Sequence, residues 1–587
     1  MSFSRSATTM LALATMGLFI GAAPRGAPSA APKSSLAATT AAKPASSTKS
    51  IYADKNFAGK NSTPIPKIAS TRTPAEVAAK ADALLQEELL STSKTAPTAR
   101  CNDATFLRRA TLDLTGEIPT PDELEHFAAD KSPDKRAKLV EALLAKPDYG
   151  VNWAHYWRDV IMARRAEDRS LLVAMPLTKY LTEELNKNTP WDQLARSFIT
   201  AKGSIDENGD TAIIMAQMGN TEDVTSEITR IFMGIQISCA NCHNHPTDRW
   251  QREQFHELAA FFPRVEVRPM KVGEKRSFEV IGLNRDPLFK GNNMIRRASA
   301  EHYMPDLKNP AAKGTRMEPV FFATGDKLSP GKSDEERRRD LANWLTSPRD
   351  EWFAKAIINR LWSELVGEGF YEPVDDMGPD RQCSAPKTMQ LLAVEFVGHD
   401  YDVKWLYRTI MTTSAYQRES RSRRNPDETP FIASTHQQLR ADQIFTSLTK
   451  ALGIHESFAD TGVAYRPRGQ ARNPRAQFDA VFNYDPSTRR DEISGSIPQA
   501  LMLMNSYQLA RFEKGTNRAT DLGRLLAEEK NDEKVVVDLY RRALARDPQS
   551  SEVQTCLTYV KKSNSRSEAF EDILWSLVNC TEFLHRK

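Results

Sequence analysis

Four stretches of the chain share one helix-starting pattern: a hydroxyl residue, then proline, then an acid two residues further on. They are Thr73-Pro-Ala-Glu76, Thr120-Pro-Asp-Glu123, Thr189-Pro-Trp-Asp192 and Ser347-Pro-Arg-Asp350. The hydroxyl can cap the first turn, and proline fits the first helical position because its missing N–H is not needed there. The acid can bond back to the cap or favour the helix dipole. The repeated pattern predicts helices on both sides of the chain's middle and a mainly α fold.

Apolar residues at helical spacing flank a polar segment between residues 236 and 251. The stripe before it is Val224, Ile228, Ile231, Phe232 and Ile235, and the stripe after it is Phe255, Leu258, Ala259 and Phe262, closed by Pro263. A repeat near 3.6 residues is typical of an amphipathic helix with one buried face. The segment between them is therefore expected to connect two helices and to lie against a packed surface.

The pattern changes between about residues 264 and 323. Alternating residues appear in Val265-Glu-Val-Arg268, Ser277-Phe-Glu-Val-Ile281 follows, and glycine and proline become frequent. Helical spacing resumes from Ser333. We therefore expect two helical domains, at residues 72–263 and 324–587, with a small β-containing insert or long loop at 264–323.

The first 71 residues are expected to be an export segment and a spacer. Arg5 precedes an apolar run from Met10 to Ala23, which is typical of a secretory signal peptide over residues 1–23, and the small residues that follow offer more than one cleavage point. A retained anchor is the alternative. Residues 24–71 are rich in Ala, Pro, Ser and Thr, which predicts a disordered spacer. The expected location is the periplasm or cell envelope, with no transmembrane span in the mature chain.

The polar segment contains Cys239-Ala-Asn-Cys242-His243, the C-x-x-C-H pattern of c-type haem attachment. In that chemistry Cys239 and Cys242 would bond the porphyrin vinyl groups, and His243 would become the proximal iron ligand. The sixth ligand is open, with Met215, Met218 and His256 as candidates.

Other readings of the same cysteines are a zinc-type metal site, a redox disulfide and purely structural thiols. Zinc could use Cys239, Cys242, His243 or His245, with Asp248 as a further ligand or as a partner that orients the ligands. The sequence offers no second C-x-x-C or H-x-x-x-H to complete such a site. A thioredoxin-like disulfide would need a strand followed by a helix, which the neighbouring sequence does not suggest.

Two further clusters are ambiguous. Asp375, Asp376 and Asp380 could form an acidic site or a solvated loop. Arginines interleaved with aromatic residues could bind an anionic polysaccharide or envelope component, or could simply anchor a long loop: Arg466, Arg468, Arg472, Arg475, Arg489 and Arg490, with Tyr465, Phe478, Phe482 and Tyr484. The net charge of +4 is small for 587 residues, so nucleic acid is not an expected partner.

Several motifs together resemble the planctomycete cytochrome-c-like domain (domain of unknown function 1549) and its usual C-terminal partner (domain of unknown function 1553). The first is carried by Phe106–Gly116, Ile118-Pro-Thr-Pro121, Asp148–Trp153 and the C-x-x-C-H block. The second is carried by Asn359-Arg-Leu-Trp362, Glu372–Asp376, Thr413–Gln417, Pro498-Gln-Ala-Leu501 and Trp575–Phe583. The family name implies haem c through the same cysteines and histidine.

The sequence therefore predicts an exported, haem-binding protein for periplasmic or cell-envelope electron transfer with a redox partner protein. The alternative is a zinc-type, metal-stabilised interaction or enzyme-accessory module of the envelope. The sequence singles out no catalytic residues.

Overall fold

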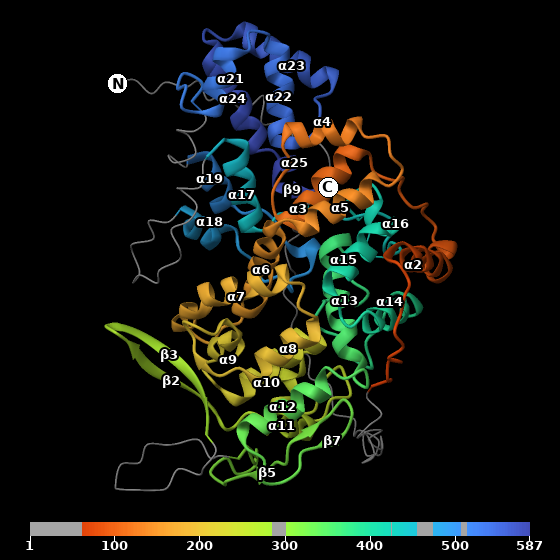
Figure 1. Ribbon diagram of the computed structural model, residues 1–587, viewed down its shortest axis with the longest axis vertical. Coiled ribbons are helices and arrows are strands. Elements are labelled where there is room, and N and C mark those ends of the chain that lie inside the picture. The colour runs from red at the N-terminus through yellow and green to blue at the C-terminus, as the bar shows by residue number, and fades with distance from the viewer. Residues whose placement is uncertain (1–61, 284–300, 424, 426, 455–473, 506–513) are drawn as a thin grey trace, which may run out of the picture. The chain divides into compact units, whose positions relative to one another are not determined.

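The computed structural model describes residues 62–283, 301–423, 425, 427–454, 474–505 and 514–587 (Figure 1). The expected signal peptide and most of the expected spacer lie outside this part. Residues 62–71, assigned to the spacer from sequence, run along the second half of the chain. Ile65 is buried, and its N–H donates to the carbonyl of Pro348 at 2.7 Å.

Helices make up most of the first half of the described chain, and short 3₁₀ turns connect some of them. The α-helices are α2 (Pro74–Glu88), α3 (Asp103–Thr115), α4 (Pro121–Ala129), α5 (Lys135–Ala145), α6 (Pro147–Met162), α7 (Ala174–Asn186), α8 (Trp191–Thr200), α9 (Ala212–Ala216), α10 (Thr221–Met233) and α11 (Arg252–Ala259). The 3₁₀ turns are η2 (Leu90–Thr92), η3 (Asp168–Val173), η4 (Gly209–Thr211) and η5 (Ile237–Asn241).

The second half is also helical, which confirms the mainly α prediction. Its elements are α12 (Asp334–Leu345), α13 (Glu351–Val366), α14 (Pro386–Gly398), α15 (Val403–Thr412), α16 (Ser414–Gln417), α17 (Ala441–Ala451), α18 (Pro474–Phe482), η7 (Arg490–Glu492), α19 (Ile497–Asn505), α21 (Asp521–Glu528), α22 (Asp532–Leu544), α23 (Ser550–Lys562), α24 (Arg566–Val578) and α25 (Thr581–Leu584). Within the described ranges, every helix is too short or too polar to cross a bilayer.

The strands are few and short, and most of them lie between the two helical halves. They are β1 (Gly203–Ser204), β2 (Val265–Val272), β3 (Lys275–Gly282), β4 (Tyr303–Met304), β5 (Thr315–Arg316), β6 (Val320–Phe321), β7 (Asp326–Lys327), β8 (Gln437–Gln438) and β9 (His585–Arg586). Strands β2 and β3 form an antiparallel hairpin, and β1 joins it through β3. Strands β2 to β6 lie within residues 264–323, where the sequence predicts a β-containing insert or long loop.

Two of the four predicted helix starts are confirmed and two are capped differently. Thr73 and Thr120 each form a capping box with the acid three residues on. Before α8, however, the Thr189 hydroxyl donates to Glu184 at 2.6 Å, and the first helical N–H of Trp191 donates to the carbonyl of Tyr401. Ser347 lies in a turn, and Asp350 caps α13 instead. A tertiary hydrogen bond at α8, and a cap three residues further along the chain at α13, replace the local pattern at these two sites.

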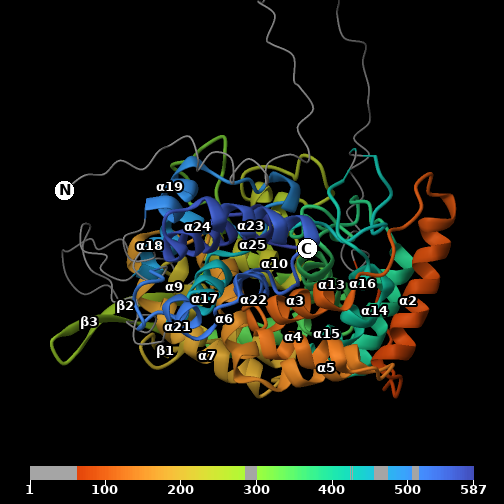
Figure 2. The same cartoon turned by 90° about the horizontal axis from the view of Figure 1, so that it is seen from above.

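The hydrophobic core does not follow the division between the sequence halves. The larger cluster of buried side chains runs from Ile65 to Phe431 and includes residues of both halves. The smaller cluster unites residues 439–583 with Leu112 and Ile118 from the first half. Figures 1 and 2 show α2 beside α14, and α2 also contacts α15. The two halves of the sequence therefore pack against each other and contribute to the same hydrophobic clusters.

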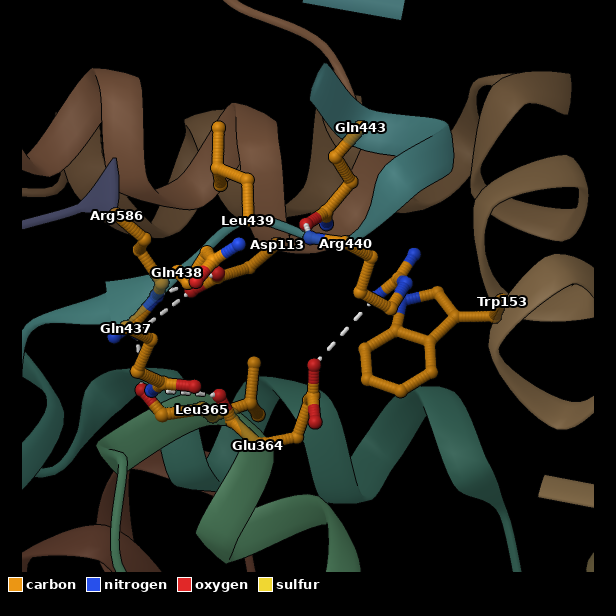
Figure 3. Close-up of a pocket in the computed structure, with 10 residues that line it drawn as sticks. All are labelled: Asp113, Trp153, Glu364, Leu365, Gln437, Gln438, Leu439, Arg440, Gln443 and Arg586. Atoms are coloured by element: carbon orange, nitrogen blue, oxygen red, sulfur yellow. Dashed lines mark hydrogen bonds and ion pairs between the residues drawn. The ribbon is translucent and has the colours of Figure 1, made fainter. Parts of the chain in front are cut away.

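Buried ion pairs accompany this shared core. The Arg586 guanidinium, one residue before the C-terminus, bonds both carboxylate oxygens of Asp113 on α3, at 2.6 and 2.8 Å. Close by, Arg440 lies 3.5 Å from Glu364. These four side chains line one small internal cavity (Figure 3). The end of the chain is thus tied to a helix near its beginning.

Replacing Asp113 with alanine tests this tie. The change would leave the Arg586 guanidinium buried without its carboxylate, which should lower the free energy of unfolding by about 3–5 kcal/mol. The control is Asp134→Ala, which removes an exposed ion pair with Lys138 and should leave stability unchanged. Chemical denaturation measures both. Equal stability of the two variants would show that the Asp113 pair does not hold the chain end.

Candidate functional site

The C-x-x-C-H segment forms a 3₁₀ turn on the surface. The predicted flanking stripes are confirmed, because every one of their residues is buried, although Ile235 and Phe262 lie just beyond the ends of α10 and α11. Turn η5 starts after α10 and ends before Cys242. A 3₁₀ turn places residues three apart on the same face. Ile237 and Ala240 accordingly point inward and are fully buried, whereas Cys239 and Cys242 are both exposed. The two thiols therefore share one solvent-facing side of the turn.

His243 follows the second thiol and is also exposed. Its Nδ1 lies 2.8 Å from the carbonyl oxygen of Asn244. A carbonyl oxygen can only accept, so Nδ1 carries the proton and the lone pair of Nε2 is left for a metal. Histidines that bind metals commonly donate their other ring N–H to a backbone carbonyl in this way.

His245 and Asp248 follow the turn in the chain and are less exposed than His243. His245 Nδ1 accepts from the backbone N–H of Thr247 at 3.4 Å, and burial lowers the pKa of this imidazole. Asp248 is buried, and its Oδ1 accepts from the N–H of Arg249 at 2.7 Å. Burial raises the pKa of Asp248. Its Oδ2 lies 3.9 Å from Nε of Arg381. Asp248 thus helps to dock the segment after the turn, whereas the bonds of His245 to Thr247 and Trp250 order the segment itself.

The docking surface is a loop from the second half, residues 375–381. The backbone N–H of Met377 donates to the carbonyl of Gly234 at 2.7 Å. Arg381 Nη2 donates to Thr247 Oγ1 at 2.8 Å, and Arg249 pairs with Asp380. The loop therefore holds the chain on both sides of the cysteines.

Gly234 is the residue that permits the close approach before the turn. It ends α10 with φ of 66°, and a Cβ there would lie 2.6 Å from Sδ of Met377. A side chain would meet both a strained backbone and a steric clash.

Asp375 anchors the loop in a buried cluster of charges. Its carboxylate accepts from Gln236 Nε2 at 2.8 Å and lies 3.4 Å from both Arg230 and Arg164. Burial by itself would raise the pKa of Asp375, but the guanidinium groups of Arg360, Arg230 and Arg164 hold it below its ordinary value. Arg230 also bonds Glu227 through two nitrogens, at 3.0 and 2.6 Å. Gln236 directly precedes η5, so the cluster supports the turn itself.

The predicted acidic cluster is thereby explained as structural support. Asp375, Asp376 and Asp380 each pair with arginine, through Arg230, Arg381 and Arg249 respectively. Asp375 is buried, Asp376 is half-buried and Asp380 is exposed, so only part of this loop is open to solvent. The sequence did not reveal these arginine partners, because Arg230 and Asp375 are 145 residues apart.

Two histidines support the turn from the other side. His256 on α11 donates from Nε2 to the carbonyl of Asn241 at 3.0 Å, and its Nδ1 lies 2.8 Å from Nε2 of His302. Arg252 Nε reaches the same carbonyl at 3.2 Å. Asn241 is the second intervening residue of C-x-x-C, so this pair fixes the backbone between the thiols. Sequence analysis missed His302 because it lies in the irregular insert.

The three residues suggested as a sixth ligand lie in different surroundings. Met215 on α9 is fully buried, and Met218 is half-buried. His256 has both ring nitrogens engaged in hydrogen bonds.

Trp250 is buried as well, and its ring packs edge-on against Phe322 with centroids 5.0 Å apart.

The described part of the arginine-rich cluster is packed internally. Arg490 pairs with Glu364, and Phe478 stacks on Phe482 with centroids 4.3 Å apart. Arg475 lies over the Phe445 ring. Tyr465, Arg466, Arg468 and Arg472 lie outside the described residues. The described members thus anchor their own segment, and binding of an anionic polysaccharide stays a prediction.

The donor groups at the turn match the set that covalent haem needs, namely two thiols and an adjacent imidazole. Two exposed thiols share one face, and the imidazole beside them has Nε2 available. In the part of the chain that can be described, no three histidine, cysteine or acidic side chains come together as a metal ion would require. Cys239, Cys242 and His243 would hold haem, and the iron would then be bound by His243 Nε2.

Fold and site define a mainly helical protein that presents an exposed C-x-x-C-H turn on a base of buried ion pairs. Residues 80–267 match PSCyt2, a protein of unknown function (DUF1549), and residues 337–464 match PSD1, a protein of unknown function (DUF1553). The chain therefore contains these two domains, in the order that the sequence motifs predict. No curated protein and no solved structure matches the chain. The turn lies in the first matched region and its supporting loop lies in the second.

Gly378→Ala tests the docking of the loop. A Cβ at this position would lie 1.9 Å from Oδ2 of the buried Asp248, so the loop or the carboxylate must move. Overpacking of this kind should cost about 1–3 kcal/mol of stability. Gly495→Ala is the control, because the nearest atom would be 4.0 Å away. Thermal unfolding compares the two, and an undisturbed Gly378→Ala variant would contradict this close packing.

The histidine pair predicts acid sensitivity. Burial lowers the pKa of both His256 and His302 from 6.5 to about 4. Below pH 6.5 the unfolded chain therefore takes up protons that the folded chain refuses, and stability should fall as the pH drops towards 4. The thermal midpoint should fall less between pH 7 and 5 in a His256→Leu/His302→Leu double variant. His126→Leu, at an exposed site, is the control, and an equal fall in all three proteins would refute the assignment.

Proposed function

We propose that the protein carries one covalent c-type haem on the exposed turn and transfers electrons in the periplasm or cell envelope. The observation that carries the proposal is the placement of Cys239 and Cys242 on one solvent-facing side, with His243 next to them. When bound, haem supplies reversible one-electron chemistry at its iron. The expected partner is a redox protein.

Each residue of the turn has a separate role in this proposal. Cys239 and Cys242 each hold one edge of the porphyrin through a thioether, while Ile237 and Ala240 anchor the turn in the core. The Asn244 carbonyl fixes the His243 tautomer, so Nε2 is the coordinating atom. An exposed turn favours electron transfer between proteins, because a partner can approach the porphyrin edge.

The support beneath the turn has a role in positioning. His256 and Arg252 hold the Asn241 carbonyl, and Gln236 is held by Asp375. These contacts pre-organise the backbone so that three groups reach one macrocycle. Rigid positioning of this kind is what a site on a surface turn needs.

The test is protein produced in a periplasm that has cytochrome c maturation machinery. We expect a pyridine haemochrome spectrum, with the haem retained after acid-acetone extraction. The Cys239→Ala/Cys242→Ala double variant should lose all retained haem, and each single variant should keep at most one thioether. His243→Ala should keep a porphyrin with an altered Soret band, because the iron loses its proximal nitrogen.

Cys580→Ala is the matched control, since this half-buried thiol lies far along the chain at the start of α25. It should keep the wild-type spectrum. Colourless wild-type protein that contains one zinc ion, lost in the cysteine variants, would refute haem and establish the metal-stabilised module instead.

A further inference from the structure

The small internal cavity of Figure 3 is lined by residues from both matched regions of the chain. Trp153 on α6 lines it and is only 1 % exposed, and among the described residues its indole Nε1 has no hydrogen-bond partner. A buried donor without an acceptor is costly and rare in folded proteins, so this N–H points to a bound acceptor. We propose that the cavity binds one structural water molecule, which joins Trp153 to Glu364 and Arg440.

The size of the cavity fits a single water molecule. The space open to the centre of a water-sized sphere is about 10 Å³. On this measure, one ordered water needs at least about 10–15 Å³. An organic ligand such as a sugar ring is therefore too large for this cavity.

The bonds around the cavity leave one guanidinium nitrogen for the water. Arg440 donates to Asp442 through Nε and Nη2, both at 3.1 Å. Its Nη1 lies 3.5 Å from Oε1 of Glu364, which is longer than a usual N–H···O bond. A water molecule beside this pair can accept from Nη1 and donate to the carboxylate. Across the cavity, Asp113 and Arg586 already bond each other through two oxygens and two nitrogens.

The chemistry of these groups selects water over an ion. The Trp153 ring, the Arg440 guanidinium and the Glu364 carboxylate lie on one side of the cavity (Figure 3). The indole and the guanidinium can only donate, whereas the carboxylate can only accept. A water molecule accepts from both donors and donates to the carboxylate. Chloride would meet the carboxylates of Glu364 and Asp113 with no proton to donate, and a metal cation would meet two guanidinium groups.

The water belongs to the contact between the two matched regions. Trp153 lies in the first region, whereas Glu364 on α13 and Arg440, the residue before α17, lie in the second. Buried waters that satisfy polar groups in this way are part of a folded structure and are costly to remove. The site therefore supports the packing of the two regions and needs no haem.

A crystal structure of the purified full chain, at a resolution that shows ordered water, tests the proposal. We expect one density peak without anomalous scattering, about 2.7–3.2 Å from Trp153 Nε1, Arg440 Nη1 and a Glu364 oxygen. In solution, the indole N–H of Trp153 should show a nuclear Overhauser cross-peak to a long-lived water. The loss of this indole signal in Trp153→Phe assigns it.

The Trp153→Phe variant also removes one donor, so the density peak should be lost from this position. Trp405→Phe is the matched control, because this indole is also buried with no partner for Nε1 among the described residues but does not line the cavity. It should keep the peak, and circular dichroism checks that both variants are folded.

Four results would each overturn the proposal: a direct bond from Trp153 Nε1 to a protein acceptor, an ion at this position, no density there in the wild type, or an unchanged peak in Trp153→Phe. The wild-type measurements decide even if a variant fails to fold. The test does not use haem, so its outcome is separate from that of the proposed electron transfer.

Discussion

A buried ion pair between Arg230 and Asp375 is the contact on which the site depends. Both side chains are about 1 % exposed, so each has lost its hydration. Such a loss is tolerated only where further bonds surround the charges. Glu227, the Val160 carbonyl and Ser487 bind Arg230, and Arg164 and Gln236 reach Asp375. This cluster sets where α10 ends and where the cysteine turn begins.

The cluster also explains why the two matched regions occur together in one chain. The turn belongs to residues 80–267, and the loop that supports it belongs to residues 337–464. Arg230 of the first region pairs with Asp375 of the second, and Asp113 of the first region pairs with Arg586, which lies beyond both matched regions. Apolar residues also connect distant parts of the chain, because Leu112 and Ile118 pack with the C-terminal helices. Separating residues 80–267 from the rest of the chain would expose apolar side chains of both clusters.

The helices and the turn could be predicted from sequence because their causes are local. Periodic apolar residues identified α10 and α11, and capping boxes identified the starts of α2 and α4. The predicted caps of α8 and α13 were wrong. The Tyr401 carbonyl accepts from the first N–H of α8, and Asp350 is the N-cap of α13. The long-range contacts that support the turn could not be predicted, although Asp375 and His256 were candidates for other roles. Asp375 and His302 reach it across long chain separations, and no periodicity encodes such contacts.

The exposed thiols and the hydrogen bond of His243 to the Asn244 carbonyl are the features on which we base the proposal of haem attachment. Intact-mass spectrometry of denatured wild-type protein, matured where cytochrome c is assembled, tests this most directly. The account predicts the mass of the mature polypeptide plus one haem, on a peptide that contains Cys239 and Cys242. The mass of the polypeptide alone would contradict it.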